Sequence, residues 1–212
     1  MNIIRFFRAA AAFATVVAAT TFATTASANP FFLFGQPFQP QSNYAAPGTE
    51  DSYDAPYRLR RQVVDYRTAE APGTIVIDTP NTYLYLVLGN GKALRYGIGV
   101  GREGFTWSGT QSITKKAEWP DWTPPAEMIA RQPYLPRYMA GGPGNPMGAR
   151  AMYLGNTIYR IHGTNDPTTI GGRVSSGCIR MTNEDVIDLY SRVNLGTKVV
   201  VLPVHDRRAA VQ

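Results

Sequence analysis

The chain has 212 residues, of which 44% are hydrophobic and 17% are charged. This composition is typical of one globular domain with accessory segments and argues against a disordered, fibrous or multi-span membrane protein. The formal net charge of +6 comes from lysines and arginines that are scattered along the chain. Such a mildly basic protein suits an anionic surface but lacks the concentrated basic stripe expected of a nucleic-acid-binding protein.

Residues 1–28 resemble a signal peptide. Arg5 and Arg8 form a basic start, residues 9–23 are apolar and uncharged, and Ala26-Ser27-Ala28 offers small residues for cleavage. The apolar run is short for a membrane span, and no second one follows; an uncleaved anchor or a buried helix is the alternative. We therefore predict export to the periplasm or cell envelope, with no transmembrane segment after signal removal. Cleavage would lower the formal charge from +6 to +4, because residues 1–28 hold two arginines and no acid.

Residues 29–72 are rich in Pro, Gln, Tyr, Phe and Ala and show no clear periodicity. This pattern predicts an extended tether between the export signal and the folded domain. The segment also holds an aromatic cluster that is unusual for a linker and could dock on the domain or on a partner. Its members are Phe31, Phe32, Phe34 and Phe38.

From residue 73 the pattern becomes that of a mainly β domain. β-branched and apolar runs predict strands, and Gly89-Asn90-Gly91 between two of them is a strong hairpin signal. Residues 119–148 are crowded with Pro, Gly, Trp and Met, which predicts a long ordered loop of the kind that lines a site. The expected strands are residues 74–79, 82–88, 93–100, 151–154, 157–161 and 198–204.

One helix is expected near the C-terminal end of the domain. Thr182 or Asn183 can cap it, Asp185 lies in its first turn, and Asn194-Leu195-Gly196 ends it. The catalytic domain is thus expected to span residues 73–203, followed by a basic tail at residues 204–212. The apolar positions at helical spacing are Val186, Leu189, Tyr190 and Val193.

Cys178 is the only cysteine of the chain. Cysteines of exported proteins usually pair, and a single one cannot pair within its own chain. It is therefore buried and inert, joined to another molecule, or kept as a reactive thiol.

The neighbours of Cys178 favour the reactive thiol. A thiol attacks a carbonyl as thiolate, so it needs a base or a positive field nearby. His162 is one of two histidines, and the other, His205, lies in the tail. His162 ends an expected strand, where its side chain can project from a rigid edge.

The residues beside Cys178 predict acyl transfer through a thioester. Gly177 and the amides of Ser175 and Ser176 can form a concave nest, which the start of the following helix would reinforce for a thiolate or oxyanion. Arg180 can bind a substrate carboxylate in fork geometry. The alternative is that Cys178 is a small buried hydrophobe and the imidazole a hydrogen-bonded strand-end residue.

These residues resemble a known family. His162-Gly163, a spacer, then Ser175-Ser176-Gly177-Cys178-Ile179-Arg180 is similar to the signature of the YkuD-type L,D-transpeptidases, the ErfK/YbiS group. Further similar pieces, such as EWPDWTPPAEM and GGPGNPMGARAMYL, extend the resemblance over about residues 73–203. The resemblance implies an L,D-transpeptidase-type β-sandwich with a short helix after the nucleophile, without cofactor or metal.

The resemblance also implies the reaction and the roles of the site residues. Cys178 would attack a peptidoglycan stem peptide between its third residue and D-Ala, with His162 as general base and then acid. The resulting thioester would pass to an amine, forming a 3–3 crosslink or attaching an envelope protein to the wall. Backbone amides around Gly177 and Cys178, with Ser176 beside them, would form the oxyanion hole. The carbonyl of Gly163 would orient the imidazole, and Arg180 would bind substrate.

One position departs from the family pattern: Ser176 stands where many members carry a second histidine. This excludes a mechanism that needs a second imidazole but leaves the transpeptidase prediction in place. Two alternatives remain, an L,D-carboxypeptidase or crosslink hydrolase that uses water as acceptor, and a non-catalytic wall-binding tether.

Other signals are weaker. Residues 99–104 match G-x-G-x-x-G, but no helix pattern follows, so we predict a strand-end turn rather than a nucleotide site. Two distant histidines and one cysteine do not make a metal set. Ordinary packing is the simpler interpretation of Trp107, Trp119 and Trp122, with a sugar or peptide platform as the alternative.

Overall fold

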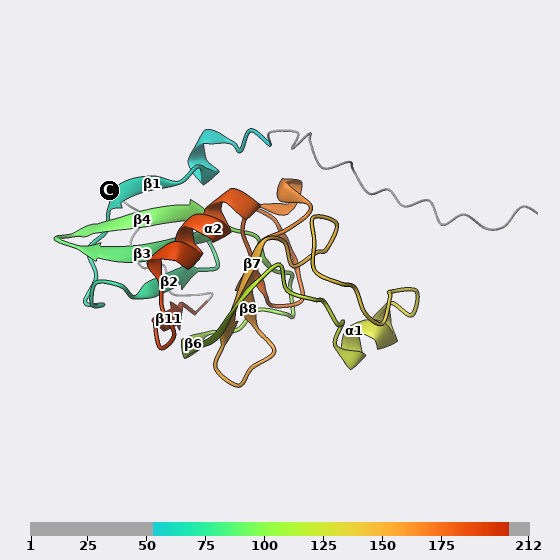
Figure 1. Cartoon of the computed structure of the whole chain (residues 1–212). Coiled ribbons are helices and arrows are strands. Elements are labelled where there is room, and N and C mark those ends of the chain that lie inside the picture. The colour runs from blue at the N-terminus through green and yellow to red at the C-terminus, as the bar shows by residue number, and fades with distance from the viewer. Residues whose placement is uncertain (1–52, 204–212) are drawn as a thin grey trace, which may run out of the picture. The chain divides into compact units, whose positions relative to one another are not determined.

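The computed structural model describes residues 53–203, and strands account for most of the regular structure in that range (Figure 1). Two α-helices and two 3₁₀ turns complete it. The helical elements are η1 (Tyr57–Leu59), α1 (Ala126–Arg131), η2 (Pro167–Thr169) and α2 (Asn183–Arg192). The strands are β1 (Gln62–Asp65), β2 (Ile75–Asp78), β3 (Tyr83–Gly89), β4 (Lys92–Gly97), β5 (Val100–Gly101), β6 (Gly109–Glu118), β7 (Arg150–Leu154), β8 (Arg160–His162), β9 (Arg173–Ser175), β10 (Ile179–Arg180) and β11 (Lys198–Val201).

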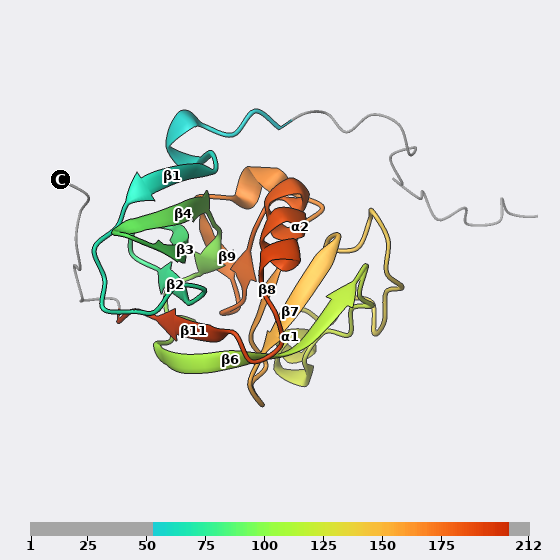
Figure 2. The same cartoon turned by 60° about the vertical axis from the view of Figure 1, so that its left-hand side comes forward.

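Nine strands form one strongly curved sheet in the order β1-β4-β3-β2-β11-β6-β7-β8-β10, and β5 pairs with β9. The curvature comes from β6, whose first residues pair with β11 and whose later residues pair with β7. In Figure 2, β6 runs below β11 and then turns up beside β7. The sheet therefore folds into a sandwich-like arrangement, which confirms the mainly β prediction.

The predicted hairpin is the connection between β3 and β4. Asn90 has φ 51° and Gly91 has φ 69°, the left-handed conformation that a two-residue hairpin turn with native twist requires. The register pairs Leu86 with Leu94 and Tyr85 with Arg95. The Asn-Gly signal therefore located this turn correctly.

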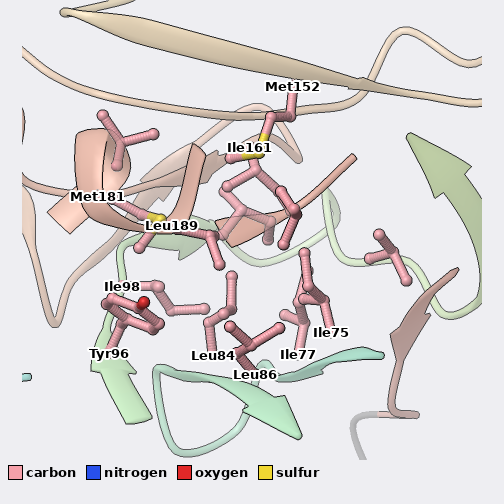
Figure 3. Packing of buried hydrophobic residues seen from close by; sticks show 14 of the residues in the cluster. Ile75, Ile77, Leu84, Leu86, Tyr96, Ile98, Met152, Ile161, Met181 and Leu189 are labelled. Carbon is pink, nitrogen blue, oxygen red and sulfur yellow. The ribbon is translucent and has the colours of Figure 1, made fainter. Parts of the chain in front are cut away.

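The core lies between the β2–β3 half of the sheet, the β7–β8 half and α2 (Figure 3). Each fully buried aliphatic side chain contributes about 1.5–3 kcal/mol. Ile161 of β8 and Ile179 of β10 both face this core, so the core fixes the two strands from one side and leaves their other side for a site. The labelled core residues of Figure 3 are Ile75, Ile77, Leu84, Leu86, Tyr96, Ile98, Met152, Ile161, Met181 and Leu189.

Helix α2 begins and ends close to its predicted limits. Thr182 is the N-cap, and its Oγ1 accepts a hydrogen bond from the amide of Asp185 at 3.1 Å. Val186 and Leu189 are fully buried on the inner face, as the helical spacing predicted. The Oδ1 of Asn183 accepts from the amide of Ala149 at 2.8 Å, which ties the helix start to the beginning of β7.

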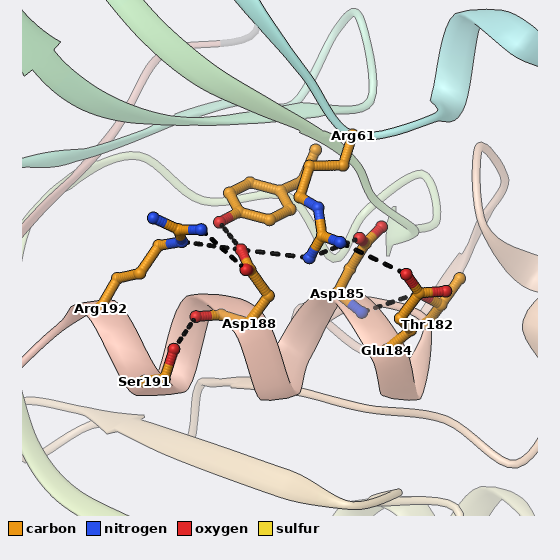
Figure 4. Close-up of polar contacts among 8 residues, drawn as sticks. Arg61, Thr182, Glu184, Asp185, Asp188, Ser191 and Arg192 are labelled. Atoms are coloured by element: carbon orange, nitrogen blue, oxygen red, sulfur yellow. Dashed lines mark hydrogen bonds and ion pairs between the residues drawn. The ribbon is translucent and has the colours of Figure 1, made fainter.

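An ionic cluster ties α2 to the segment before β1 (Figure 4). Arg61 lies 3.1 Å from Asp188, 3.3 Å from Glu184 and 3.7 Å from Asp185. Burial raises the pKa of Asp185 to about 6, against the opposing effect of Arg61. The hydrogen bonds of Arg192 lower the pKa of Asp188 to about 2, despite some burial. The two carboxylates therefore prefer opposite protonation states at mildly acidic pH.

The tether prediction for residues 29–72 is wrong for its last part. β1 pairs antiparallel with β4, and Leu59 of η1 is 2% exposed. A Cβ on Gly97 would overlap Leu59, which shows how closely this segment packs. The sequence did not reveal this strand because four residues are too few to show the apolar–polar alternation of an edge strand.

Several other predictions fall outside the described residues. These are the signal peptide, the aromatic cluster of residues 31–38, the tail at residues 204–212 and His205. Within residues 53–203, no helix is long and apolar enough to cross a membrane.

The remaining element predictions were partly right. Residues 93–100 divide into β4 and β5, and the strand expected at 157–161 begins only at Arg160 and includes His162. The region 119–148 is largely a loop, as predicted, but it contains the short helix α1 (Figure 1). The longest strand, β6, was not predicted.

Candidate active site

The site is built on the parallel pairing of β8 with β10. The register places Ile179 beside Ile161 and Arg180 beside His162. Since side chains alternate along a strand, one step back places Cys178 beside Arg160. The two isoleucines face the core, so Arg160, His162, Cys178 and Arg180 share the opposite face. The structure thus brings the thiol and the imidazole to one side of the sheet.

His162 is held in one orientation. Its Nδ1 lies 2.6 Å from the carbonyl oxygen of Gly163, and because a carbonyl can only accept, Nδ1 carries the proton and Nε2 the lone pair. Burial, with the nearby charge of Arg180, lowers the pKa of His162 to about 4. A Cβ on Gly163 would overlap the Asn183 side chain, so a glycine is required where the orienting carbonyl lies. The imidazole is therefore neutral at pH 7.

Cys178 also rests in its neutral form. Its Sγ–H donates to the carbonyl of Ile158 at 3.8 Å. Burial raises the pKa of the thiol, and hydrogen bonds and charge from Arg160, with the charge of Arg180, oppose that rise. A neutral thiol that shares a cavity with a neutral imidazole can lose its proton as it attacks, which is general-base catalysis rather than reaction from a preformed ion pair.

A tight turn sets the position of the thiol. Ser175 Oγ donates to the carbonyl of Cys178 at 2.6 Å and accepts from the amide of Gly177 at 3.1 Å. Gly177 has φ +106°, and a Cβ there would meet Tyr159 at 2.5 Å. The Gly177 amide is therefore directed into the turn, which differs from the nest expected for an oxyanion.

Trp107 orients the peptide between Gly177 and Cys178. Its Nε1–H donates to the Gly177 carbonyl at 2.9 Å, and its ring stacks on Tyr159 with centroids 4.4 Å apart. In a trans peptide the C=O and the following N–H point in opposite directions. The bond from Trp107 therefore turns the Cys178 N–H away from it. No hydrogen bond of residues 53–203 uses this N–H, so it is the candidate oxyanion donor.

A cavity of about 500 Å³ opens over this face and is lined by His162, Cys178, Arg180 and the predicted Ser176. The long loop between β6 and β7 contributes Trp122 and α1 to its wall, as a site-lining loop was expected to do. The guanidinium groups of Arg102 and Arg131 both contact the ring of Phe105, at 4.3 and 4.9 Å from its centroid. This stack joins α1 to the connection between β5 and β6.

The sequence reasoning missed two residues of the site, Trp107 as a contact of the nucleophile turn and Arg160. The motif Arg160-Ile161-His162 alternates polar, apolar and polar residues, and Cys178-Ile179-Arg180 does the same. That shared alternation was the available signal for Arg160.

The helix start is not directly beside the thiol, because β10 lies between Cys178 and α2. No contact therefore supports the expected stabilisation of a thiolate or oxyanion by the helix start.

The G-x-G-x-x-G match has the predicted form of a strand end. Val100 and Gly101 are β5, residues 103 and 104 form a turn, and the next regular element is β6 rather than a helix. Among residues 53–203, no three His, Cys, Asp or Glu side chains come together as a metal site.

Comparison with known proteins identifies the family. The model of the YkuD L,D-transpeptidase catalytic domain matches residues 72–201. The chain belongs to this family. Among curated L,D-transpeptidase relatives, the protein named Probable L,D-transpeptidase YbiS of Escherichia coli K12 is 40% identical over 135 residues, which are 59% of this chain and 43% of YbiS. The chain thus matches less than half the length of this relative.

One solved structure supports the fold, and a second one is similar in sequence. The carbamoyl enzyme of the L,D-transpeptidase Ldtfm with avibactam is 21% identical, covers 64% of this chain and 51% of Ldtfm, and has a TM-score of 0.52. A crystal structure from Brucella melitensis, named as a probable carnitine operon oxidoreductase caia, is 52% identical and covers 70% of this chain and 96% of that one, with a TM-score of 0.47.

Proposed function

We propose that this L,D-transpeptidase family member acts on peptidoglycan stem peptides, with Cys178 as nucleophile and His162 as general base. The β8–β10 register is the observation that carries the proposal, because it places both side chains on one face under a common cavity. The Nδ1–H bond to Gly163 supports the role of the imidazole, since it leaves Nε2 able to accept a proton.

The first half-reaction forms a thioester. As Sγ attacks the carbonyl before the terminal D-Ala, its proton passes to His162, and the Cys178 N–H stabilises the oxyanion. The C–N bond breaks, the imidazolium returns its proton to the leaving amine, and D-Ala departs. In the second half-reaction an acceptor amine loses a proton to His162 as it attacks. The C–S bond then breaks, and the imidazolium returns its proton to Sγ.

The acceptor is a second stem peptide or a protein amine, which gives a 3–3 crosslink or a wall-attached envelope protein. Arg180 supports substrate binding, because it lines the cavity and none of the described carboxylates forms an ion pair with it.

We further propose that residues 1–28 direct export to the periplasm and that residues 29–52 act as the tether. The folded part then begins with η1 and extends to residue 203, with residues 204–212 as a tail. This division follows from the signal-like composition of the N-terminus and from the packing of η1 and β1 on the domain.

Intact-mass analysis with a tetrapeptide donor tests the proposal. The wild-type protein is expected to gain the mass of the donor minus D-Ala, and Cys178→Ser and His162→Gln are expected to gain none. Adding a second stem peptide should then yield a crosslinked dimer. Trimmed tripeptide without dimer would favour the hydrolase, and no adduct on the wild-type protein would contradict the assignment of the nucleophile.

A further inference from the structure

The cavity carries more positive charge than the chain itself neutralises. Its lining includes four arginines and one acid, Glu127, while His162 is neutral. None of the four guanidinium groups forms an ion pair among the described residues. An anionic ligand is therefore the natural complement of this cavity. The four arginines are Arg102, Arg131, Arg160 and Arg180.

Two of these arginines belong to strands of the sheet, Arg160 to β8 and Arg180 to β10. Arg160 and Arg180 each have a buried Nε that makes no hydrogen bond. A buried donor without a partner is costly and is normally satisfied, so both side chains are prepared to receive an acceptor. The charge of Asp166 acts on Arg180, but the Asp166 side chain accepts hydrogen bonds from Thr168. The guanidinium of Arg160 lies 5.2 Å from the ring centroid of Tyr153, and it also acts on the Cys178 thiol by a hydrogen bond and by its charge.

The strand register distinguishes the positions of Arg160 and Arg180. Arg180 lies beside His162, whereas Arg160 lies beside Cys178. A group that binds Arg160 must therefore lie close to the carbonyl that the sulfur attacks. In a donor that loses its last residue, the terminal carboxylate is one residue beyond that carbonyl, within about 4 Å of it.

We infer that Arg160 is a specificity-determining residue that binds the C-terminal carboxylate of the donor peptide and so selects a donor that ends one residue after the attacked carbonyl. This inference rests on the proposed function. A donor with a C-terminal amide lacks the charge, and a pentapeptide places its carboxylate one residue too far. Both are therefore poor donors for the wild-type protein.

The competing role of Arg160 is electrostatic support of the sulfur. That role would act on every substrate alike, because it changes the nucleophile and not the recognition of the leaving residue. The ratio of kcat/KM between matched donors separates the two roles.

The experiment compares a tetrapeptide donor as free acid and as C-terminal carboxamide, with release of D-Ala or D-alaninamide followed by mass spectrometry. The wild-type protein is expected to favour the acid by about 10- to 100-fold, the effect of one charged hydrogen-bonded contact. Arg160→Gln is expected to lose most activity on the acid and to bring the ratio to within about 3-fold. Arg160→Lys, which keeps the charge without the fork, should give an intermediate ratio.

Arg173→Gln is the matched control, because Arg173 is exposed, donates to the Pro80 carbonyl and does not line the cavity. It should retain the wild-type ratio, and unchanged melting temperatures would show that all variants fold. An equal loss of acid and amide turnover in Arg160→Gln would overturn the inference while leaving the proposed function intact. A wild-type protein that releases neither D-Ala from the acid nor D-alaninamide from the amide would overturn both the inference and the proposed function.

Discussion

Replacing Trp107 with phenylalanine tests how the nucleophile turn is oriented. The variant keeps an aromatic ring against Tyr159, at a stacking distance of 4.4 Å, but removes the Nε1–H that donates to Gly177 at 2.9 Å. The Gly177–Cys178 peptide then loses the contact that directs the Cys178 N–H. We expect slower acylation with little change in KM, because the oxyanion exists only in the transition state.

Two known free energies bound the loss of transition-state stabilisation expected in Trp107→Phe. Losing a single hydrogen bond costs about 0.5–1.5 kcal/mol, and losing an entire oxyanion donor costs about 2.7–4 kcal/mol. Trp107→Phe misaligns the donor without deleting it, so we expect about 1–2 kcal/mol, or about 5- to 30-fold in the acylation rate constant. Single-turnover acylation by a tetrapeptide donor, followed by intact mass, measures this constant directly.

Trp119→Phe provides the control. It makes the same chemical change at a tryptophan that is 40% exposed and does not line the cavity, so its rate constant should match the wild type. An unchanged rate constant in Trp107→Phe would refute the orientation argument. If Trp107→Phe lowered the acylation rate constant and also lowered the melting temperature by several degrees, lost packing of the ring would explain the slower rate instead.

Three further predictions concern ionisation. Because burial lowers the pKa of His162 to about 4, kcat/KM should stay level from about pH 7 down to pH 5 and fall near pH 4; a fall centred on the ordinary value near 6.5 would show an exposed imidazole. Because burial raises the pKa of the Cys178 thiol, iodoacetamide should alkylate it with a midpoint above about 8.5, the value of a free cysteine; a midpoint below 8 would mean a preformed thiolate. The carboxyl of Asp185 has its pKa raised to about 6, so its charged form costs stability above pH 6, and this cost disappears towards pH 4. Raising the pH from 5 to 7.5 should therefore increase the stability advantage of Asp185→Asn over the wild type by about 1 kcal/mol in thermal unfolding; an advantage that stays constant over this range would contradict the burial argument.

The elements that the sequence predicted well are those with local signals. β2 and β3 are continuous apolar runs, Asn90-Gly91 has the residues that its turn requires, and α2 has a cap with apolar positions at helical spacing. β6 has none of these features. Of its ten residues only Ile113 is buried, and the strand exists because β11 and β7 flank it. Pairing between segments far apart in the chain supplies its order, and no local pattern records it.

The site residues also divide into those that the sequence could identify and those that it could not. Cys178 and His162 could be found because each residue type is rare in this chain and their chemistry requires a partner. Trp107 could not, because its contact with Gly177 spans 70 residues and depends on how β5 and β6 are joined. The alternation of polar and apolar residues could have placed Arg160 on the same face as His162. Only the register between β8 and β10 places it beside the sulfur.

The protonated resting state of Cys178 affects how fast the thiol reacts with oxidants and alkylating agents. Peroxides and disulfides react with the anionic form of sulfur, so a site that keeps its sulfur protonated reacts with them slowly. The same site becomes nucleophilic when an electrophilic carbonyl arrives beside His162. Reagents that present an acyl group to this cavity should therefore inactivate the protein far faster than simple oxidants or alkylating agents do.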